Sequence, residues 1–119
     1  MTSQRRVVCL LLLCGVAAAS GCRRNDFRTA VIRVPACRTD ACREIIEKAL
    51  DGAPGVRVET LSVDFATGRL TLEYDSMKLA MKNIEFLIAR AGFEANDIPA
   101  DPAAAAKLPA ECAPSETGR

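Results

Sequence analysis

The chain has 119 residues, enough for one small domain with some flanking sequence. Its formal net charge is +1, so the composition does not indicate a nucleic acid or an acidic polymer as a partner. The chain has no Trp and no His, and the absence of His removes the usual general base and the commonest nitrogen ligand for zinc or copper(II). Six Cys and three Met are the soft ligands that remain.

Residues 1–21 have the pattern of a secretory signal peptide. Arg5 and Arg6 provide a positive start, and the apolar run 7–19 that follows carries no charge. This run is too short for a membrane-spanning helix, and the small residues 19–21 stand at a cleavage position. We therefore expect an exported protein from which this segment is removed.

The residues Ala19-Ser20-Gly21-Cys22 resemble a bacterial lipobox, in which the Cys becomes the lipidated first residue of the mature chain. Ala19 departs from that motif, which prefers Leu or another aliphatic residue. The resemblance implies lipidation of Cys22, a tether over residues 22–28 and a location in the bacterial periplasm, anchored to a membrane. Simple secretion as a soluble protein remains the alternative.

The number of cysteines left in the mature chain limits the kinds of site that they can form. Cys9 and Cys14 leave with the signal peptide, and a lipidated Cys22 is no longer a thiol. Three thiols remain in an oxidising compartment, which suits either a metal site or one disulfide plus a free thiol. These thiols are Cys37, Cys42 and Cys112.

The first predicted element is a strand over residues 29–34. Ala30, Ile32 and Val34 alternate with other residues and predict one buried face, and Pro35 ends the run. A helix is expected next, because apolar residues then recur at intervals of three and four. Its apolar positions are Cys42, Ile45, Ile46, Ala49 and Leu50, its cap is Thr39 or Asp40, and it stops at the breaker cluster 51–55.

The second half predicts a hairpin, a second helix and a last strand. The alternation slips after residues 56–58, which indicates a bulge or loop before a strand that begins at about Thr60. The further elements are a turn at 66–68, a strand over 70–74, a helix from Asp75-Ser76 to Gly92 with Met77 in its apolar stripe, and a short strand over 93–98.

This order of elements predicts an α+β fold, a ferredoxin-like βαββαβ sandwich over residues 29–98. Residues 99–119 are rich in Ala, Pro and charge, and we expect a flexible tail in which residues 103–108 form at most a helical turn. The chemical feature of this tail is Cys112.

Residues 29–97 resemble the heavy-metal-associated domain, a family that includes copper chaperones, modules of metal-pumping ATPases and periplasmic mercury-binding proteins. The residues that carry the resemblance are Val34, Cys42, Ile46-Glu47, Ala49-Leu50, Pro54-Gly55-Val56, Thr67-Gly68, Tyr74-Asp75 and Ala91-Gly92-Phe93. The resemblance implies the ferredoxin-like fold and the binding of a soft metal ion by thiolates.

The loop that holds the metal in that family differs here. Thr39 occupies the position of the first cysteine, and Cys37 stands where the family has methionine. Four residues separate Cys37 from Cys42, where the family has two. Only Cys42 is therefore implied as a ligand by the resemblance, whereas Cys37 is proposed because thiolates select soft ions.

The candidate metal ligands are Cys37, Cys42 and, as a third ligand, Cys112. Cys42 is expected in the first turn of a helix, where the amide dipoles stabilise a thiolate. Copper(I) and mercury(II) accept two sulfurs, whereas a closed zinc site needs four ligands. We expect copper(I) as the cargo and a metal-transporting membrane protein as a further partner.

Two alternatives stay open. One is a domain that keeps the fold but docks a partner without metal, with Cys37 and Cys42 in a structural disulfide. The other is a thiol-redox protein in which the Cys37–Cys42 disulfide is redox-active. Catalysis is not expected, because the chain has no His and its carboxylates show no pairing that would raise a pKa. The carboxylates expected on solvated faces are Glu44, Glu47, Glu73 and Glu85.

Overall fold

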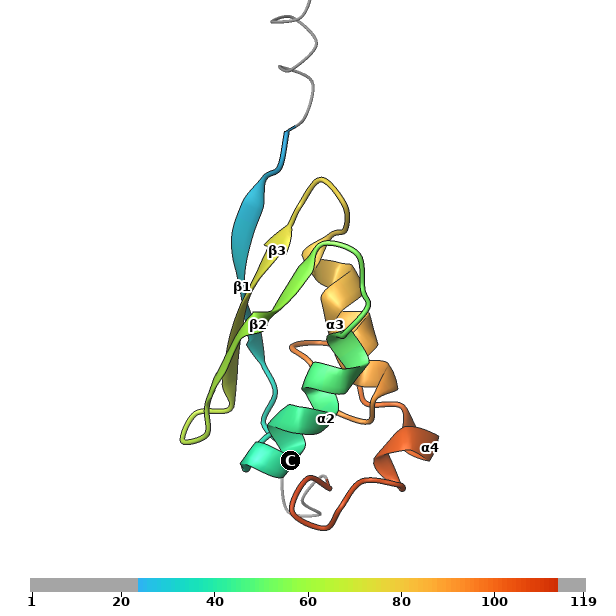
Figure 1. The fold of residues 1–119 in the computed structure, drawn as a ribbon. Helices are drawn as coiled ribbons and strands as arrows, with labels where there is room; N and C mark the ends of the chain where they lie inside the picture. Colours follow the sequence, from blue (N-terminus) through green and yellow to red (C-terminus); the bar gives the residue numbers. More distant parts are fainter. Residues whose placement is uncertain (1–23, 114–119) are drawn as a thin grey trace, which may run out of the picture.

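The computed structural model describes residues 24–113, in which a three-stranded antiparallel sheet is covered on one face by two helices (Figure 1). The predicted signal peptide and Cys22 lie outside the described residues. The elements are β1 (Phe27–Arg33), α2 (Asp40–Leu50), β2 (Val56–Asp64), β3 (Arg69–Asp75), α3 (Met81–Arg90) and α4 (Pro102–Ala105). The strand order is β1-β3-β2. This arrangement confirms the predicted α+β ferredoxin-like class.

Strand alternation and helix periodicity produce one core between the sheet and the helices. Ala30 and Ile32 of β1 are buried while their neighbours are exposed, as a half-buried strand requires. Burying each large aliphatic side chain contributes about 1.5–3 kcal/mol before the cost of ordering the chain. The other fully buried large residues of this layer include Ile46, Leu50, Leu70, Leu72, Ile84, Ile88 and Phe93.

The predicted irregularity in β2 is a bulge that a side chain stabilises. The pairing register of β2 with β3 shifts between Arg57 and Ser62. Within the bulge the Thr60 hydroxyl accepts a hydrogen bond from the Glu73 N–H at 2.8 Å and donates to the Arg57 carbonyl at 2.7 Å. The hydroxyl therefore satisfies two backbone groups that the shifted register leaves without strand partners.

The second helix begins later than its apolar periodicity predicts. The Asp75 side chain accepts from the Met77 N–H at 3.0 Å, and the Asp75 carbonyl accepts from the Lys78 N–H at 3.0 Å. These bonds hold residues 75–80 as a turn, because an Asp side chain competes with helix formation at such positions. The placement of Met77 in the helix stripe was wrong, since its side chain is 66% exposed.

The predicted last strand over 93–98 does not form among the described residues, which hold only an isolated bridge between Ala95 and Ile98. Asn96 takes its place at the open edge of β1. Its N–H donates to the Arg33 carbonyl at 2.9 Å, and its side-chain oxygen accepts from the Arg33 N–H at 2.9 Å. Asn96 has φ 50°, a left-handed conformation that ends a strand and that Asn tolerates better than most residues.

The segment expected as a flexible tail folds back as far as it is described. The Asp101 N–H donates to the Ala89 carbonyl at 2.9 Å, and α4 begins directly afterwards. Cys112 is completely buried, so residues 101–113 belong to the folded unit rather than to a separate tail. In residues 24–113 there is no helix long and apolar enough to cross a membrane.

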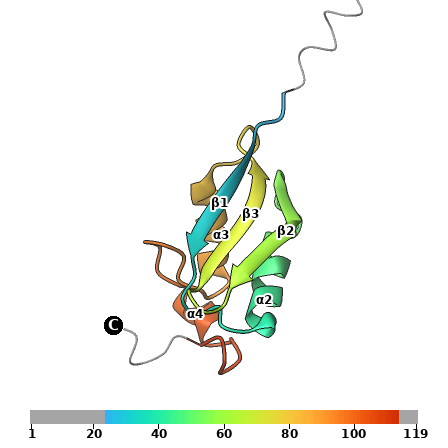
Figure 2. The same cartoon turned by 90° about the vertical axis from the view of Figure 1, so that its left-hand side faces the viewer.

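The molecule has two distinct ends. The start of β1 and the turn between β3 and α3 lie at one end, and the start of α2 and α4 lie at the other, in both views (Figures 1 and 2). The antiparallel order of the strands requires this, since Phe27 at the start of β1 pairs with Asp75 at the end of β3.

Candidate functional site

A disulfide between Cys42 and Cys112 marks the end of the molecule where α2 begins. Their Cα atoms are 5.5 Å apart, 70 residues apart in sequence, and both side chains are fully buried. Cys37 is a free thiol and is also buried. The structure thus brings two of the three predicted ligands together and leaves Cys37 out of the bond. The alternative pairing of Cys37 with Cys42 was wrong.

The backbone around Cys42 favours negative charge on its sulfur. Thr39 is the residue before α2, which makes Cys42 the third residue of the helix, within the first turn whose N–H groups lack helical partners. The Thr39 hydroxyl lies 3.2 Å from the Cys42 sulfur instead of capping a backbone N–H. Because a disulfide sulfur has no proton, the hydroxyl is the donor here. The same hydroxyl and the helix dipole would stabilise a Cys42 thiolate after reduction.

Cys37 is in a different environment. Burial raises the pKa of its thiol from about 9 to about 11, and Arg43 opposes that rise without cancelling it. Cys37 is therefore protonated at neutral pH, although it lies only five positions before Cys42 in the chain. A protonated thiol is a poor nucleophile and a poor metal ligand.

The segment that leads to Cys112 packs closely against Gly92 on its way to the start of α2. Gly92 has φ +107°, and a Cβ at this position would lie 2.8 Å from the Ala105 nitrogen, so only glycine lets the chain pass here. Beyond α4, the Arg38 guanidinium donates to the Ala113 carbonyl at 2.8 Å. This bond joins the segment after Cys112 to the loop before α2, in addition to the disulfide.

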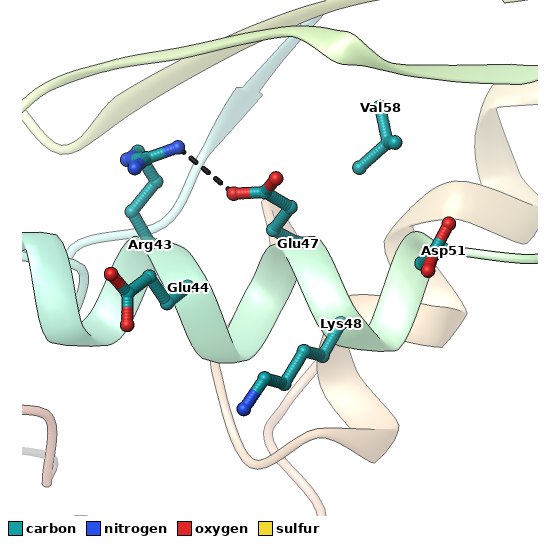
Figure 3. Close-up of a pocket in the computed structure, with 6 residues that line it drawn as sticks. All are labelled: Arg43, Glu44, Glu47, Lys48, Asp51 and Val58. Atoms are coloured by element: carbon teal, nitrogen blue, oxygen red, sulfur yellow. Dashed lines mark hydrogen bonds and ion pairs between the residues drawn. The ribbon is translucent and has the colours of Figure 1, made fainter.

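A second candidate is an open depression of about 440 Å³ over α2 (Figure 3). Its lining is Arg43, Glu44, Glu47, Lys48, Asp51 and Val58. The Glu47 carboxylate accepts a hydrogen bond from the Arg43 guanidinium at 3.0 Å, so one carboxylate of the depression is already paired with a positive charge. In residues 24–113 no group of three or more His, Cys, Asp or Glu is placed to hold a metal ion, and the carboxylates of this depression form no such group.

One carboxylate was misplaced by the sequence pattern. Glu85 was expected on a solvated face but is only 2% exposed. Its Oε1 accepts from the Asn96 side-chain amide at 2.8 Å. Its Oε2 lies 2.9 Å from Lys82 Nζ, an ion pair without the geometry of a hydrogen bond. Glu85 thus fixes the edge of the sheet and does not face the thiols.

Sequence reasoning identified all three thiols but missed which of them meet. Nothing in the spacing of Cys112 predicts its partner, since a bond that spans 70 residues depends on the path of the whole chain. The odd number of thiols was the available signal, because it allows one disulfide plus one free thiol. That combination is the one observed.

No protein-family model matches the chain, and no curated protein matches it either. Solved structures do. Oxidized MerP from Ralstonia metallidurans CH34 is 24% identical with a TM-score of 0.53, and the match covers 60% of this chain and 96% of MerP. A CopZ metallochaperone is 22% identical with a TM-score of 0.52, over 57% of this chain and 98% of CopZ. A copper-binding domain from HMA7, a P-type ATPase, is 29% identical with a TM-score of 0.52, over 58% and 90% of the two chains.

The chain has the fold of a heavy-metal-associated domain. At such low sequence identity, the similarity of MerP and CopZ to this chain supports the fold alone. The matches nearly span each of these proteins, whereas about 40% of this chain lies outside them. In this heavy-metal-associated fold, Cys42 and Cys112 provide two sulfurs at one point, which can exist as a disulfide or, after two-electron reduction, as a dithiol.

Proposed function

We propose that the protein binds a soft heavy-metal ion, of the copper(I) or mercury(II) type, through the thiolates of Cys42 and Cys112 when their disulfide is reduced. The observation that carries the proposal is the meeting of these two sulfurs at the first turn of α2, within a heavy-metal-associated fold. Two-sulfur coordination suits soft ions, which prefer thiolate over carboxylate or water. The role is binding for metal transport or homeostasis, not catalysis.

The reduction step needs a dithiol or phosphine donor from outside the protein. A dithiol gives two electrons and two protons to the Cys42–Cys112 bond and itself becomes a disulfide. Binding of the ion then displaces the protons from the two thiols. The raised pKa of Cys37 disfavours its thiolate at neutral pH, so Cys37 would bind the ion less readily than Cys42 and Cys112.

We further propose that the protein acts in the periplasm as a lipoprotein anchored through Cys22. The support is the sequence pattern of a signal peptide followed by a lipobox-like segment. The metal would be exchanged with another protein, for which a metal-transporting membrane protein is one candidate.

Metal titration tests the assignment of the ligands. The full chain is purified after export, reduced with a phosphine without oxygen, and titrated with copper(I) against a chromophoric chelator. We expect one tightly bound ion per chain in the wild type and in Cys37→Ser, and none in Cys42→Ser, Cys112→Ser or the oxidised protein. If Cys37→Ser loses the ion while Cys112→Ser keeps it, the ligands are Cys37 and Cys42 instead. Binding no tighter than in the Cys42→Ser/Cys112→Ser double variant ends the proposal.

The buried disulfide favours a second candidate, a metal-free interaction domain. A disulfide over a long loop stabilises a small domain whatever its function. A partner captured equally well by the wild type and the double serine variant, together with a negative copper titration, would support this candidate. A Cys42–Cys112 reduction potential far below that of any cellular donor would exclude a thiol-redox role and a reducible metal site alike.

A further inference from the structure

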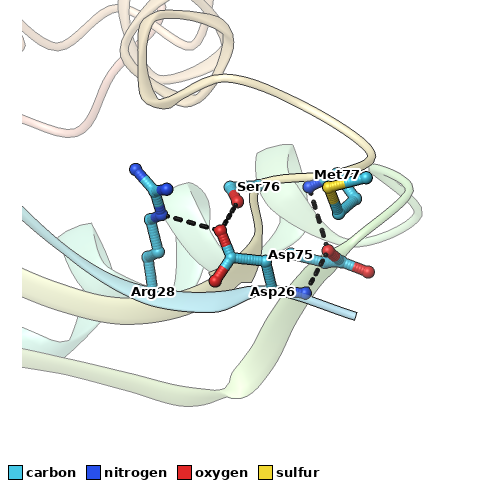
Figure 4. Close-up of polar contacts among 5 residues, drawn as sticks. All are labelled: Asp26, Arg28, Asp75, Ser76 and Met77. Carbon is cyan, nitrogen blue, oxygen red and sulfur yellow. Dashed lines mark hydrogen bonds and ion pairs between the residues drawn. The ribbon is translucent and has the colours of Figure 1, made fainter. Parts of the chain in front are cut away.

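The entry of the chain into the domain is held by a polar network around Asp26 (Figure 4). The Asp26 N–H donates to Asp75 Oδ1 at 3.1 Å, and the Ser76 N–H donates to the Asp26 carbonyl at 2.8 Å. The Ser76 hydroxyl and the Arg28 side chain both donate to the Asp26 carboxylate. These hydrogen bonds lower the pKa of Asp26. The start of β1 is thereby fastened to the turn between β3 and α3.

This fastening limits the distance between the domain and residue 22. Cys22 stands four positions before Asp26, and four fully extended residues reach at most about 14 Å. A lipid on Cys22 would therefore hold Asp26, to which the turn is bonded through Ser76, within about that distance of the membrane surface. The other end, where α2 begins, is farther away by the length of α2, roughly 16 Å for an 11-residue helix.

The side chains at the fastened end suit a lipid surface. Met77 at the tip of the turn is 66% exposed and Phe27 at the start of β1 is 42% exposed, so this end presents two large apolar side chains to solvent. Arg24, Arg28 and Lys78 are exposed on the same two segments, and the Arg57 guanidinium lies over the Phe27 ring at 3.8 Å. Exposed apolar side chains together with basic ones are the composition that binds anionic bilayers.

We propose that this end, made of Arg24, Phe27, Arg28, Met77 and Lys78, docks against the anionic surface of the membrane to which the protein is anchored. The inference rests on the proposed lipid attachment at Cys22. Asp26 and Arg28 offset each other, because Arg28 pairs with the Asp26 carboxylate at 2.9 Å, and Asp75 is only 2% exposed. Arg24 and Lys78 then supply the positive charge of this end, and Asp51 at the end of α2 opposes them.

Docking in this orientation turns the Cys42–Cys112 site away from the bilayer. The metal site then faces the aqueous compartment, where a soluble donor or acceptor reaches it without crossing the lipid surface. The anchored domain would thus collect or deliver ions on the aqueous side.

Lysine labelling on vesicles tests this orientation, because the chain offers a matched pair. Lys78 lies at the docking end and Lys107 lies near α4 at the other end, and both are exposed. The full chain, exported and purified from bacterial membranes, is placed in phosphatidylglycerol vesicles or in phosphatidylcholine vesicles, and acetylation of each lysine is timed by mass spectrometry. On phosphatidylglycerol we expect Lys78 to react roughly tenfold more slowly while Lys107 is unchanged, since each basic side chain near an anionic surface adds to the attraction.

Met77→Asp should restore the fast labelling of Lys78, whereas Ala106→Asp at the other end should not. An intact mass without lipid would refute the anchor, and the docking proposal with it. A lipid-bearing chain whose Lys78 and Lys107 react alike would overturn the docking while leaving the anchor intact. Equal slowing on phosphatidylcholine would overturn the assignment to anionic lipid.

Discussion

Two cysteines five positions apart in the chain, one in a disulfide and one a free thiol, have opposite chemical environments. Cys42 lies in the first turn of α2 with the Thr39 hydroxyl 3.2 Å from its sulfur, a setting that stabilises a thiolate. Cys37 lies in the core, where desolvation holds its thiol neutral. The position of Cys42 at the start of a helix was predictable from the sequence. The burial of Cys37 was not, because a Cys in a short loop between Ala36 and Arg38 gives no periodic signal.

Cys37 makes the free energy of unfolding decrease with pH in the alkaline range. Its pKa is raised to about 11 in the folded protein, so the unfolded chain loses this proton first as the pH rises above about 9. The unfolded state is then favoured, and the contribution of Cys37 to the free energy of unfolding, complete below pH 9, is lost as the pH rises towards 11. We expect Cys37→Ala to cost roughly 1 kcal/mol at pH 7 and progressively less above pH 9.

Urea unfolding of the two proteins from pH 7 to pH 11 measures this difference. The titration of other groups cancels in the comparison, because both proteins carry them. A difference between the wild type and Cys37→Ala that stays constant or grows with pH would contradict the assignment.

At the scale of elements, Asn96 replaces the predicted fourth strand at the edge of β1. A strand over 93–98 was predicted to pair along β1, but a single residue binds both backbone groups of Arg33. The left-handed conformation of Asn96 turns the chain away from β1 after this contact. The sequence contains an Asn at this position, yet Asn is also common in ordinary turns, so the pattern could not distinguish a short strand from a one-residue contact.

We expect Asn96→Ala to destabilise the fold by about 2–4 kcal/mol. The substitution removes the acceptor for the Arg33 N–H and the donor to the buried carboxylate of Glu85, and it places Ala at φ 50°. Denaturant unfolding measures the change. Asn96→Gly separates the two causes, because Gly tolerates this φ but has no side-chain amide. Asn83→Ala, at an exposed position on α3, is the surface control and should change stability little. A cost below about 0.5 kcal/mol for Asn96→Ala would show that water replaces both side-chain bonds.

At the scale of the whole molecule, the sequence predicted the sandwich and missed the return of the chain. The element order and the hairpin follow from local periodicity, which the strands and helices of the sandwich preserve. The segment 101–113 has little periodicity, and its place depends on three distant contacts: Asp101 with Ala89, Arg38 with Ala113, and the disulfide. Contacts between residues far apart in sequence leave no local pattern, so the Ala/Pro-rich composition suggested a tail.

The disulfide therefore controls how much of the chain belongs to the folded unit. It closes a loop of 70 residues, for which the chain-entropy model gives a stabilisation of about 4 kcal/mol. We expect Cys112→Ser, and equally the reduced wild type, to lose about this much in denaturant unfolding. In both, the amides of residues 101–113 should exchange faster with solvent, because the covalent link is lost. The segment is then held by non-covalent contacts such as the Arg38–Ala113 hydrogen bond and the packing near Gly92, which open more easily.

Copper(I) added to the reduced protein connects this stability change to the proposed function. An ion that bridges Cys42 and Cys112 binds the folded state preferentially, so it should restore part of the lost stability. Recovery should occur in the wild type and in Cys37→Ala, and should be absent in Cys112→Ser. Unfolding of the oxidised and reduced proteins at the same urea concentration would contradict the disulfide's role in stability. Equal copper-induced recovery in Cys112→Ser would show that the ion binds without Cys112.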